Sequence, residues 1–107
     1  MKRNDVLGTL GLARRAGAVV FGTSAVRAAT REGRARLVLL AADAAKGQAN
    51  KLKPLLEHRG VPHMVWGTRE ELGGAIGAAQ VSAIAITAKS FAEKVLRRLD
   101  DVDEGRQ

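Results

Sequence analysis

The sequence has no cysteine, only two histidines and few aromatic residues, which make up 3% of the chain. Without cysteine it can form neither a disulfide framework nor a thiolate metal site. With only two imidazoles, His58 and His63, we expect neither a structural zinc site nor a catalytic metal triad. No nucleophile–base pair can be assembled, and the GxGxxG and GxxxxGK(S/T) phosphate-binding motifs do not occur. We therefore expect no catalytic residue, no metal site, no cofactor and no enzymatic activity.

A long apolar run is also missing. The longest, Leu37–Ala42, is far shorter than the ~20 residues that span a bilayer. The basic residues Lys2 and Arg3 are followed by Asn4 and Asp5 rather than by the apolar segment of an export signal. With 107 residues, 46% hydrophobic and 27% charged, the composition is typical of one soluble globular domain. We expect a cytoplasmic protein with no membrane partner.

Negative charge is scarce over most of the chain. The sequence has 18 Lys and Arg against 11 Asp and Glu, a net charge of +7. Residues 100–107 hold four of the acidic residues and one basic residue, so residues 1–99 keep 17 basic and 7 acidic side chains, a net charge of +10. Twelve of the basic residues are arginines, whose planar guanidinium suits bidentate contacts with phosphate. This imbalance favours a nucleic-acid partner over charge that serves solubility alone.

The apolar periodicity predicts five helices that alternate with four strands. The strand at 37–41 is apolar on both faces, which is typical of a central strand covered by helices on each side. Strict alternation with short connections predicts an α/β fold, a three-layer α/β/α sandwich with a four-stranded mixed sheet. We expect one domain over residues 1–99 and a disordered acidic tail over 100–107, which lacks apolar anchors. The expected helices are 4–16, 23–32, 48–59, 69–76 and 88–99, and the expected strands are 18–21, 37–41, 63–66 and 82–87.

Several local signals refine these boundaries. Pro54 falls inside the third predicted helix, 48–59, and gives a later start near Lys51 or Pro54 as an alternative. Thr68 and Glu71 have the spacing of a capping box at the start of the fourth helix. Asp43, just past the central strand, is expected to cap the turn that follows it. Trp66 ends a buried strand and is expected to pack in the core.

Six segments in register resemble the kink-turn-binding ribosomal protein family of the L7Ae and L30e type, and most closely its small bacterial, YlxQ-like branch. The resemblance spans residues 5–99 and implies the L30e-like fold. The segments that carry it are Leu10–Gly17, Gly22–Gly33, Arg34–Ala44, Val61-Pro62, Glu71-Leu72-Gly73 with Ile76-Gly77, and Ser82–Ile86.

The resemblance implies a binding face for RNA. In the family, the second helix points its N-terminus at a sharply bent RNA with tandem sheared G·A pairs, and a glycine at its start lets backbone amides approach; that position is Gly22. The loop before the last strand makes the second contact. A helix N-terminus offers unpaired N–H groups and the positive end of a dipole, which supports this assignment physically. The predicted RNA-binding residues are Gly22, Thr23, Ser24, Ala25, Arg27, Ala28, Arg31, Lys46, Gly77, Ala78, Ala79, Gln80 and Val81.

The sequence departs from the family pattern on the second helix. There the glycine is commonly followed by x-Asn-Glu, with a Lys one turn further on, whereas this chain has Ser24, Ala25 and Ala28. Contacts of Asn and Glu with guanine edges cannot be made in the same way by Ser24 and Ala25. Arg27 lies one residue before the expected Lys, about 100° around the helix. These changes weaken kink-turn specificity more than they weaken RNA binding.

The arginines that follow the second helix start, at positions 27, 31, 34 and 36, are expected to form a basic rim beside Gly22. We expect a monomeric RNA-binding protein of ribosomal-protein type, associated with the ribosome and recognising structured, kink-turn-like RNA. One alternative is a protein-interaction adaptor that keeps the fold and has lost specific RNA contacts. Another is an RNA-substrate module that works with a separate modifying enzyme, because the chain lacks room for a catalytic half.

Overall fold

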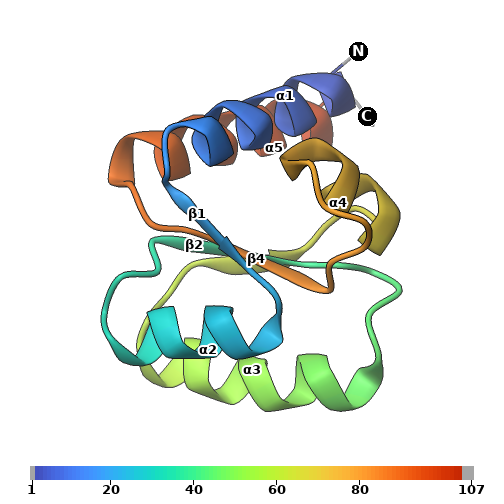
Figure 1. Ribbon diagram of the computed structural model, residues 1–107. Helices are drawn as coiled ribbons and strands as arrows, with labels where there is room; N and C mark the ends of the chain where they lie inside the picture. Colours follow the sequence, from blue (N-terminus) through green and yellow to red (C-terminus); the bar gives the residue numbers. More distant parts are fainter. Residues whose placement is uncertain (1, 105–107) are drawn as a thin grey trace.

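The computed structural model describes residues 2–104, and its helices and strands alternate as predicted. Five helices and a four-stranded mixed sheet form three layers, so the predicted architecture is confirmed (Figure 1). The elements are α1 (Lys2–Arg15), β1 (Val19–Phe21), α2 (Thr23–Arg31), β2 (Leu37–Leu40), α3 (Lys46–His58), β3 (His63–Val65), α4 (Arg69–Ile76), β4 (Ala83–Ile86) and α5 (Lys89–Glu104).

The strand order is β1-β4-β2-β3, with β4 antiparallel to both of its neighbours and β2 parallel to β3. Every residue of β2 and β4 is buried, which confirms the prediction that 37–41 contains a central strand. Because β1, β2 and β3 all run antiparallel to β4, their last residues and the first residues of β4 share one edge. We call this edge the carboxyl end of the sheet and the opposite edge the amino end.

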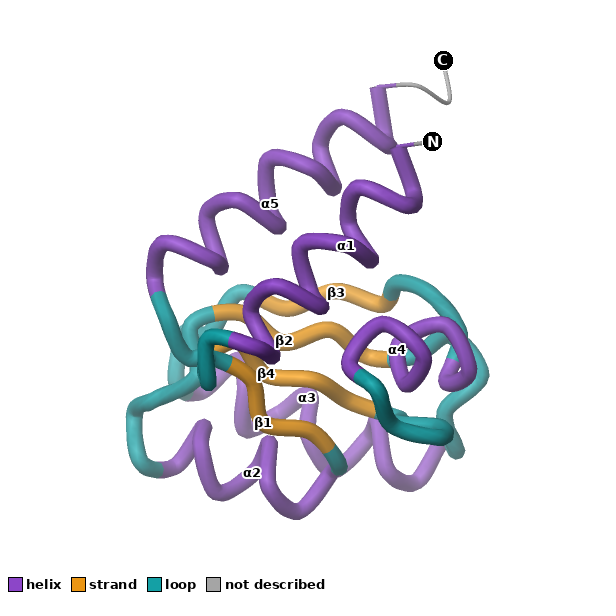
Figure 2. The backbone as a smooth tube through the Cα atoms, turned by 45° about the horizontal axis from the view of Figure 1, so that its top comes forward, coloured by secondary structure: helices purple, strands orange, loops and turns teal. Residues whose placement is uncertain are grey.

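Helices cover both faces of the sheet (Figures 1 and 2). On one face α2 and α3 pack Val26 and Leu52 among alternate residues of the central strands. On the other face α1, α4 and α5 bury Leu10, Leu72 and Val95 in a second cluster. The two clusters use opposite sides of the same strands, as the period-two alternation of strand side chains requires. No helix within residues 2–104 is long and apolar enough to cross a membrane.

The third helix begins at Lys46, so the expectation of a start near Lys51 or Pro54 is wrong. Pro54 lies inside α3, where its ring nitrogen cannot donate to the carbonyl four residues earlier. That carbonyl belongs to Asn50, an exposed residue, so water can take the place of the missing donor. Leu52 and Leu56 are fully buried on the same helix, and this burial offsets the cost of the proline.

The fifth helix continues to Glu104, past its expected end near residue 99. Once a helix has formed, each further residue adds a hydrogen bond for the backbone it fixes, so extension beyond the buried Leu99 is inexpensive. α5 therefore includes the first part of the acidic segment. The remainder of the predicted tail, residues 105–107, lies outside the described part of the chain.

Candidate nucleic-acid interface

The carboxyl end of the sheet brings together the two segments predicted to bind RNA. Gly22 follows β1 and the loop 77–82 precedes β4, and the backbone N–H of Gly22 donates to the carbonyl of Ala83 at 3.0 Å. The loop after β2 joins them, because the N–H of Ala41 donates to the carbonyl of Ser82 at 2.9 Å. Segments 60 residues apart in sequence thus form one surface (Figure 1). The sequence-based pairing of these two segments is consistent with this geometry.

Gly22 is the N-cap of α2, with φ 90° and ψ 148°. This region of backbone conformation is essentially restricted to glycine. A Cβ atom built on Gly22 would meet nothing within 4 Å, so the space in front of the helix start is open. No side chain caps the helix, which leaves its first N–H groups facing outward with the positive end of the helix dipole. An acceptor oxygen of a ligand can therefore approach the backbone directly.

The first turns of α2 expose the small residues at which the sequence departs from the family. Ser24, Ala25 and Ala28 are exposed, while Thr23 and Arg27 are half-buried. The opposite side of the helix packs Val26, Ala29 and Thr30 into the core, as its periodicity predicts. The outward surface of α2 beside Gly22 thus carries small, uncharged side chains, and Arg27 is the first basic residue of the helix.

The expected basic rim beside Gly22 does not form. Arg31 lies eight residues beyond Thr23, about 12 Å along the helix axis at 1.5 Å per residue. Arg36 lies further still, since its N–H donates to the carbonyl of Ile86 at the amino end of the sheet. Arg34 pairs with Glu32, with 2.8 Å between Nε and Oε1. Of the four arginines, only Arg27 remains near the predicted contact surface.

The loop 77–81 is held in place along α4. Gly77 ends α4 in the left-handed conformation, and the N–H of Ala78 donates to the carbonyl of Gly73 at 2.8 Å. At the far end of the loop, the N–H of Val81 donates to the carbonyl of Arg69 at 3.2 Å. Gly77, Ala79 and Gln80 are exposed and Ala78 is half-buried. Val81 is buried in the core, so its side chain anchors the loop and only its backbone is available to contact a ligand.

Gly73 positions this loop, and the sequence reasoning did not assign it that role. A Cβ atom at Gly73 would overlap the carbonyl of Ala79 and lie 3.0 Å from the Cα of Gln80. The close approach of the loop to α4 therefore requires glycine at this place. A glycine inside a helical pattern is a general signal for such a packing constraint, although the pattern does not name the partner.

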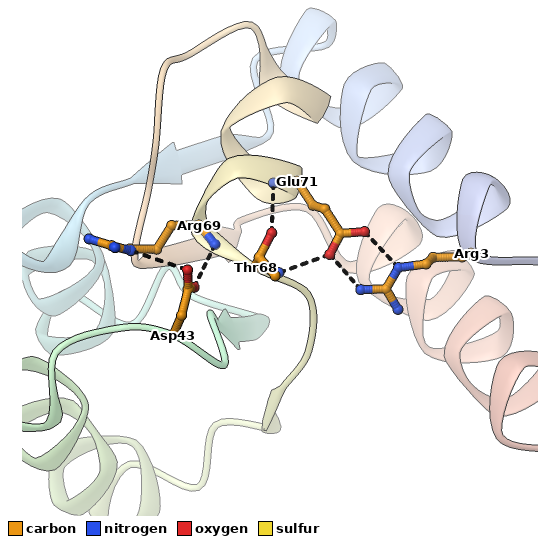
Figure 3. A network of polar contacts seen from close by, with 5 residues as sticks. All are labelled: Arg3, Asp43, Thr68, Arg69 and Glu71. Carbon is orange, nitrogen blue, oxygen red and sulfur yellow. Dashed lines mark hydrogen bonds and ion pairs between the residues drawn. The ribbon is translucent and has the colours of Figure 1, made fainter.

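Asp43 connects the loop after β2 to the start of α4, so the expectation that it caps its own following turn is wrong. Its Oδ1 accepts a hydrogen bond from the backbone N–H of Arg69 at 2.8 Å, and its Oδ2 lies 3.5 Å from the Arg69 guanidinium (Figure 3). The hydrogen bond from this N–H holds the pKa of Asp43 below its usual value. The carboxylate thereby caps a helix 26 residues further along the chain.

The predicted capping box of α4 is confirmed. The N–H of Glu71 donates to Thr68 Oγ1 at 3.1 Å, and Glu71 Oε1 accepts from the Thr68 N–H at 3.0 Å. The guanidinium of Arg3 in α1 donates two hydrogen bonds, of 2.7 and 2.5 Å, to the same carboxylate (Figure 3). These hydrogen bonds from Arg3 lower the pKa of Glu71 to about 2. The Arg3 guanidinium also lies 4.5 Å from the ring centroid of Trp66, which is buried in the core as predicted.

The electrostatic character of the carboxyl end comes chiefly from the backbone. α2, α3 and α4 follow β1, β2 and β3 respectively, so all three helices start at this end. Each start carries roughly half a positive charge from the helix dipole, and at α4 the carboxylates of Asp43, Glu70 and Glu71 offset this charge. Lys46, the first residue of α3, adds an exposed ammonium group. Within the described residues no group of three or more His, Asp or Glu side chains could hold a metal ion. The arrangement suits an anionic ligand.

Comparison with known proteins agrees with this architecture. RNA-binding protein YlxQ of Bacillus subtilis (strain 168) is 38% identical over 91 residues, which is 85% of this chain and 91% of that protein. A solved protein of unknown function from Bacillus halodurans C superposes with a TM-score of 0.85 at 33% identity, over 89% of this chain and 96% of the other.

A 15.5kD RNA binding protein of Giardia lamblia shares the fold, with a TM-score of 0.80 at 22% identity over 96% of this chain and 88% of the other. The sequence pattern of one family, described as the ribosomal protein L7Ae/L30e/S12e/Gadd45 family, matches residues 4–96, nearly the whole described chain. Both the match and the shared fold agree with the resemblance deduced from six sequence segments. The chain belongs to the ribosomal protein L7Ae/L30e/S12e/Gadd45 family.

Proposed function

We propose that this protein binds structured RNA through the carboxyl end of the sheet, with the N-terminus of α2 and the loop 77–81 as the two contacting segments. It acts as a monomer in the cytoplasm, associated with the ribosome, and recognises bent, kink-turn-like RNA. Neither a metal nor a cofactor takes part. Two similar proteins, a sequence relative from Bacillus subtilis and a structural neighbour from Giardia lamblia, are named as RNA-binding proteins, which supports the proposal.

The observation that carries the proposal is the hydrogen bond between Gly22 and Ala83. It fixes an open helix N-terminus beside a small, exposed loop, so both can contact one ligand at the same time. Asp43, Gly73 and the capping box hold the surrounding loops before any ligand arrives. A surface that is ordered in advance loses little conformational entropy on binding, which favours recognition of a rigid, bent RNA shape.

The chemistry of the surface suits phosphate and base edges rather than a protein side chain. Helix N–H groups donate to phosphate or base acceptors, and the small residues Gly77 and Ala79 leave room for an unstacked base to pack against the loop. Because Ser24 and Ala25 replace the family's Asn and Glu, recognition relies on shape and backbone donors more than on side-chain contacts with guanine. We therefore expect binding to depend strongly on RNA geometry and on salt.

The first test is a titration of a labelled kink-turn RNA beside the same RNA with its G·A pairs changed to Watson–Crick pairs, at two salt concentrations. Preference for the first RNA establishes recognition of the bend. Equal and salt-sensitive binding of both RNAs restricts the function to general RNA binding. If neither RNA binds, the protein-interaction adaptor is the better explanation, because that alternative keeps the fold and drops the RNA contacts.

The second test places a negative charge at the proposed contact. Ser24 and Ser90 are both exposed and both occupy the second position of a helix, α2 and α5 respectively, where an acidic residue is compatible with the dipole. Ser24→Glu should weaken RNA binding by at least about 100-fold through repulsion of phosphate. Ser90→Glu, at the amino end of the sheet, is the matched control and should change affinity by less than about threefold.

Equal affinities of the two glutamate variants would reject the N-terminus of α2 as the contact. These variants are preferable to a Gly22→Glu replacement, since any side chain at Gly22 must also adopt a backbone conformation reserved for glycine. A loss of binding by Gly22→Glu would not distinguish backbone strain from repulsion of phosphate. Ser24 has ordinary helical geometry and avoids the ambiguity.

A further inference from the structure

A cleft of about 270 Å³ lies between the C-terminal half of α1 and the end of α4, outside the contact surface described above. Its rim includes Gly77, the first residue of the loop 77–81, so the cleft is continuous with the proposed RNA interface. Its volume is near the lower limit of pockets that hold drug-sized ligands, which suits a single nucleotide unit better than a large cofactor.

The backbones of two helices form the base of the cleft. A Cβ atom at Gly11 would lie 3.0 Å from the carbonyl oxygen of Ala75, so α1 and α4 approach closely there. Gly74 and Gly77 contribute no side chain on the α4 side. The other lining residues are Ala75 and Ile76 of α4 and, on the opposite side, Arg14 and Arg15, the last two residues of α1, which are both exposed. The cleft therefore has a small, open base and a strongly cationic side.

Arg14 is held toward the interface by an aromatic contact. Its guanidinium lies 5.1 Å from the ring centroid of Phe21, the residue directly before Gly22. Since Arg14 is exposed while it covers this ring, the side of the guanidinium away from Phe21 is accessible to a further planar group. RNA bases commonly stack on such guanidinium planes.

Arg14 and Arg15 also differ from three other arginines in the described part of the chain. Arg3, Arg34 and Arg69 each pair with a carboxylate. Among the side chains of residues 3–100, which the structure describes, Arg14 and Arg15 form no ion pair. Their position in the last turn of α1 suits the helix dipole, but the dipole does not account for the cleft or for the contact with Phe21.

We propose that this cleft is a second RNA subsite, which takes a single-stranded nucleotide next to the bent region. One base stacks on the Arg14 guanidinium above Phe21, and Arg15 contacts the adjoining phosphate. The inference rests on the proposed function and deepens it, because it names the part of the RNA that lies outside the helix-terminus contact. It predicts that single-stranded extensions of the RNA add affinity.

The test uses the full chain and three forms of the kink-turn RNA: blunt, with a short oligouridine extension at the 5′ end, and with the same extension at the 3′ end. The unaltered protein should bind one extended RNA about tenfold more tightly than the blunt one, the effect of one stacked base. The Arg14→Ala/Arg15→Ala variant should lose this gain. Its slope of log affinity against log salt should also fall by roughly 0.7 for each lost phosphate contact.

The matched control is Arg97→Ala/Arg98→Ala, which removes two adjacent, exposed arginines from α5 and lowers the net charge equally. It should retain the gain from the extension. Arg14→Lys keeps the positive charge but loses the planar guanidinium. It should therefore lose most of the affinity gained from the extension while it keeps the slope of log affinity against log salt. Thermal unfolding of each variant verifies that the fold persists.

The outcomes separate the two proposals. If Ser24→Glu abolishes binding while Arg14→Ala/Arg15→Ala retains the full gain, the cleft proposal is wrong and the proposed function stands. If the double alanine variant loses the gain while Ser24→Glu binds normally, the cleft is confirmed and the N-terminus of α2 is not the contact. If the unaltered protein binds none of the three RNAs, both proposals fail.

Discussion

The two ends of the sheet obtain their positive potential in different ways. At the carboxyl end, the starts of α2 and α3 supply partial positive charges from the backbone, with few basic side chains beside them, whereas carboxylates cap the start of α4. At the amino end, α2 and α3 finish, and arginines such as Arg31, Arg36 and Arg59 lie at or after their C-termini. Cations there offset the negative ends of the helix dipoles. A count of arginines therefore does not locate a binding site for an anion.

The largest effect in this comparison should come from disturbing the loop order at the carboxyl end. Gly73→Ala puts a methyl group where the backbone of Ala79 lies, so the loop 77–81 must move. We expect a loss of about 1–3 kcal/mol in the free energy of unfolding, typical of overpacking. The affinity for blunt kink-turn RNA should fall about tenfold, because the loop no longer meets the ligand together with Gly22. Denaturant unfolding and RNA titration measure the two effects.

The neighbouring glycine provides the control for this change. Gly74 is exposed, and a Cβ atom built on it meets nothing within 4 Å. Gly74→Ala should leave the affinity for blunt RNA unchanged and raise stability by up to about 1 kcal/mol, because alanine is the better helix former. Similar affinities of the two alanine variants would show that the position of the loop does not matter for binding.

An effect on affinity alone, without a loss of stability, should come from reversing one charge at each end. Lys46→Glu acts at the start of α3 on the carboxyl end, and we expect RNA affinity to fall about tenfold through repulsion of phosphate. Arg36→Glu changes net charge equally, but Arg36 lies across the sheet, beyond a four-residue strand that spans about 13 Å. That separation exceeds a Debye length of roughly 8 Å at physiological salt, so affinity should fall less than about threefold.

Titration of both charge-reversal variants with the same RNA at 0.15 M salt tests this contrast. If Arg36→Glu has the larger effect, RNA contacts the arginines at the amino end of the sheet rather than the carboxyl end. If both variants have the same small effect, Lys46 lies outside the contact surface.

Local sequence signals predicted the elements well where a short pattern is sufficient. The apolar run from Leu37 indicated a strand buried on both faces, and Thr68 with Glu71 indicated the start of α4; both are confirmed. The later start that Pro54 suggested for α3 is wrong because buried leucines on the helix face outweigh the local cost of the proline. Tertiary contacts overrode a local preference in that case.

Signals that depend on distant partners could not be placed from the sequence. The acceptor role of Asp43 depends on Arg69, and the constraint on Gly73 depends on where the following loop folds back. The contact of Arg14 with Phe21 depends on how α1 crosses the edge strand β1. The error in the predicted arginine rim does not depend on a distant partner. The length of α2 alone puts Arg31 about 12 Å from the helix start.

The smallest expected effect is a change of stability with pH from the pair that fastens α4 to α1. Because Arg3 lowers the pKa of Glu71 to about 2, the pair stabilises the folded state fully above the ordinary glutamate pKa near 4.5. This contribution is lost as pH falls from about 4.5 toward 2, where the folded protein also takes up the proton. The pair is partly exposed, with side-chain exposures of 41% and 31%, so its contribution should stay below about 1 kcal/mol.

Chemical unfolding of the unaltered protein and of Glu71→Gln, measured from pH 6 to pH 2, isolates this contribution. The two free energies of unfolding should differ most at pH 6 and converge as the pH approaches 2, because protonated Glu71 and glutamine are both neutral. Glu32→Gln, the same replacement in the exposed pair with Arg34 at the amino end, controls for the general effect of removing a carboxylate. A Glu71→Gln difference close to zero at every pH would mean that Glu71 acts through the capping hydrogen bonds with Thr68 rather than through its charge, since glutamine preserves the acceptor but not the ion pair.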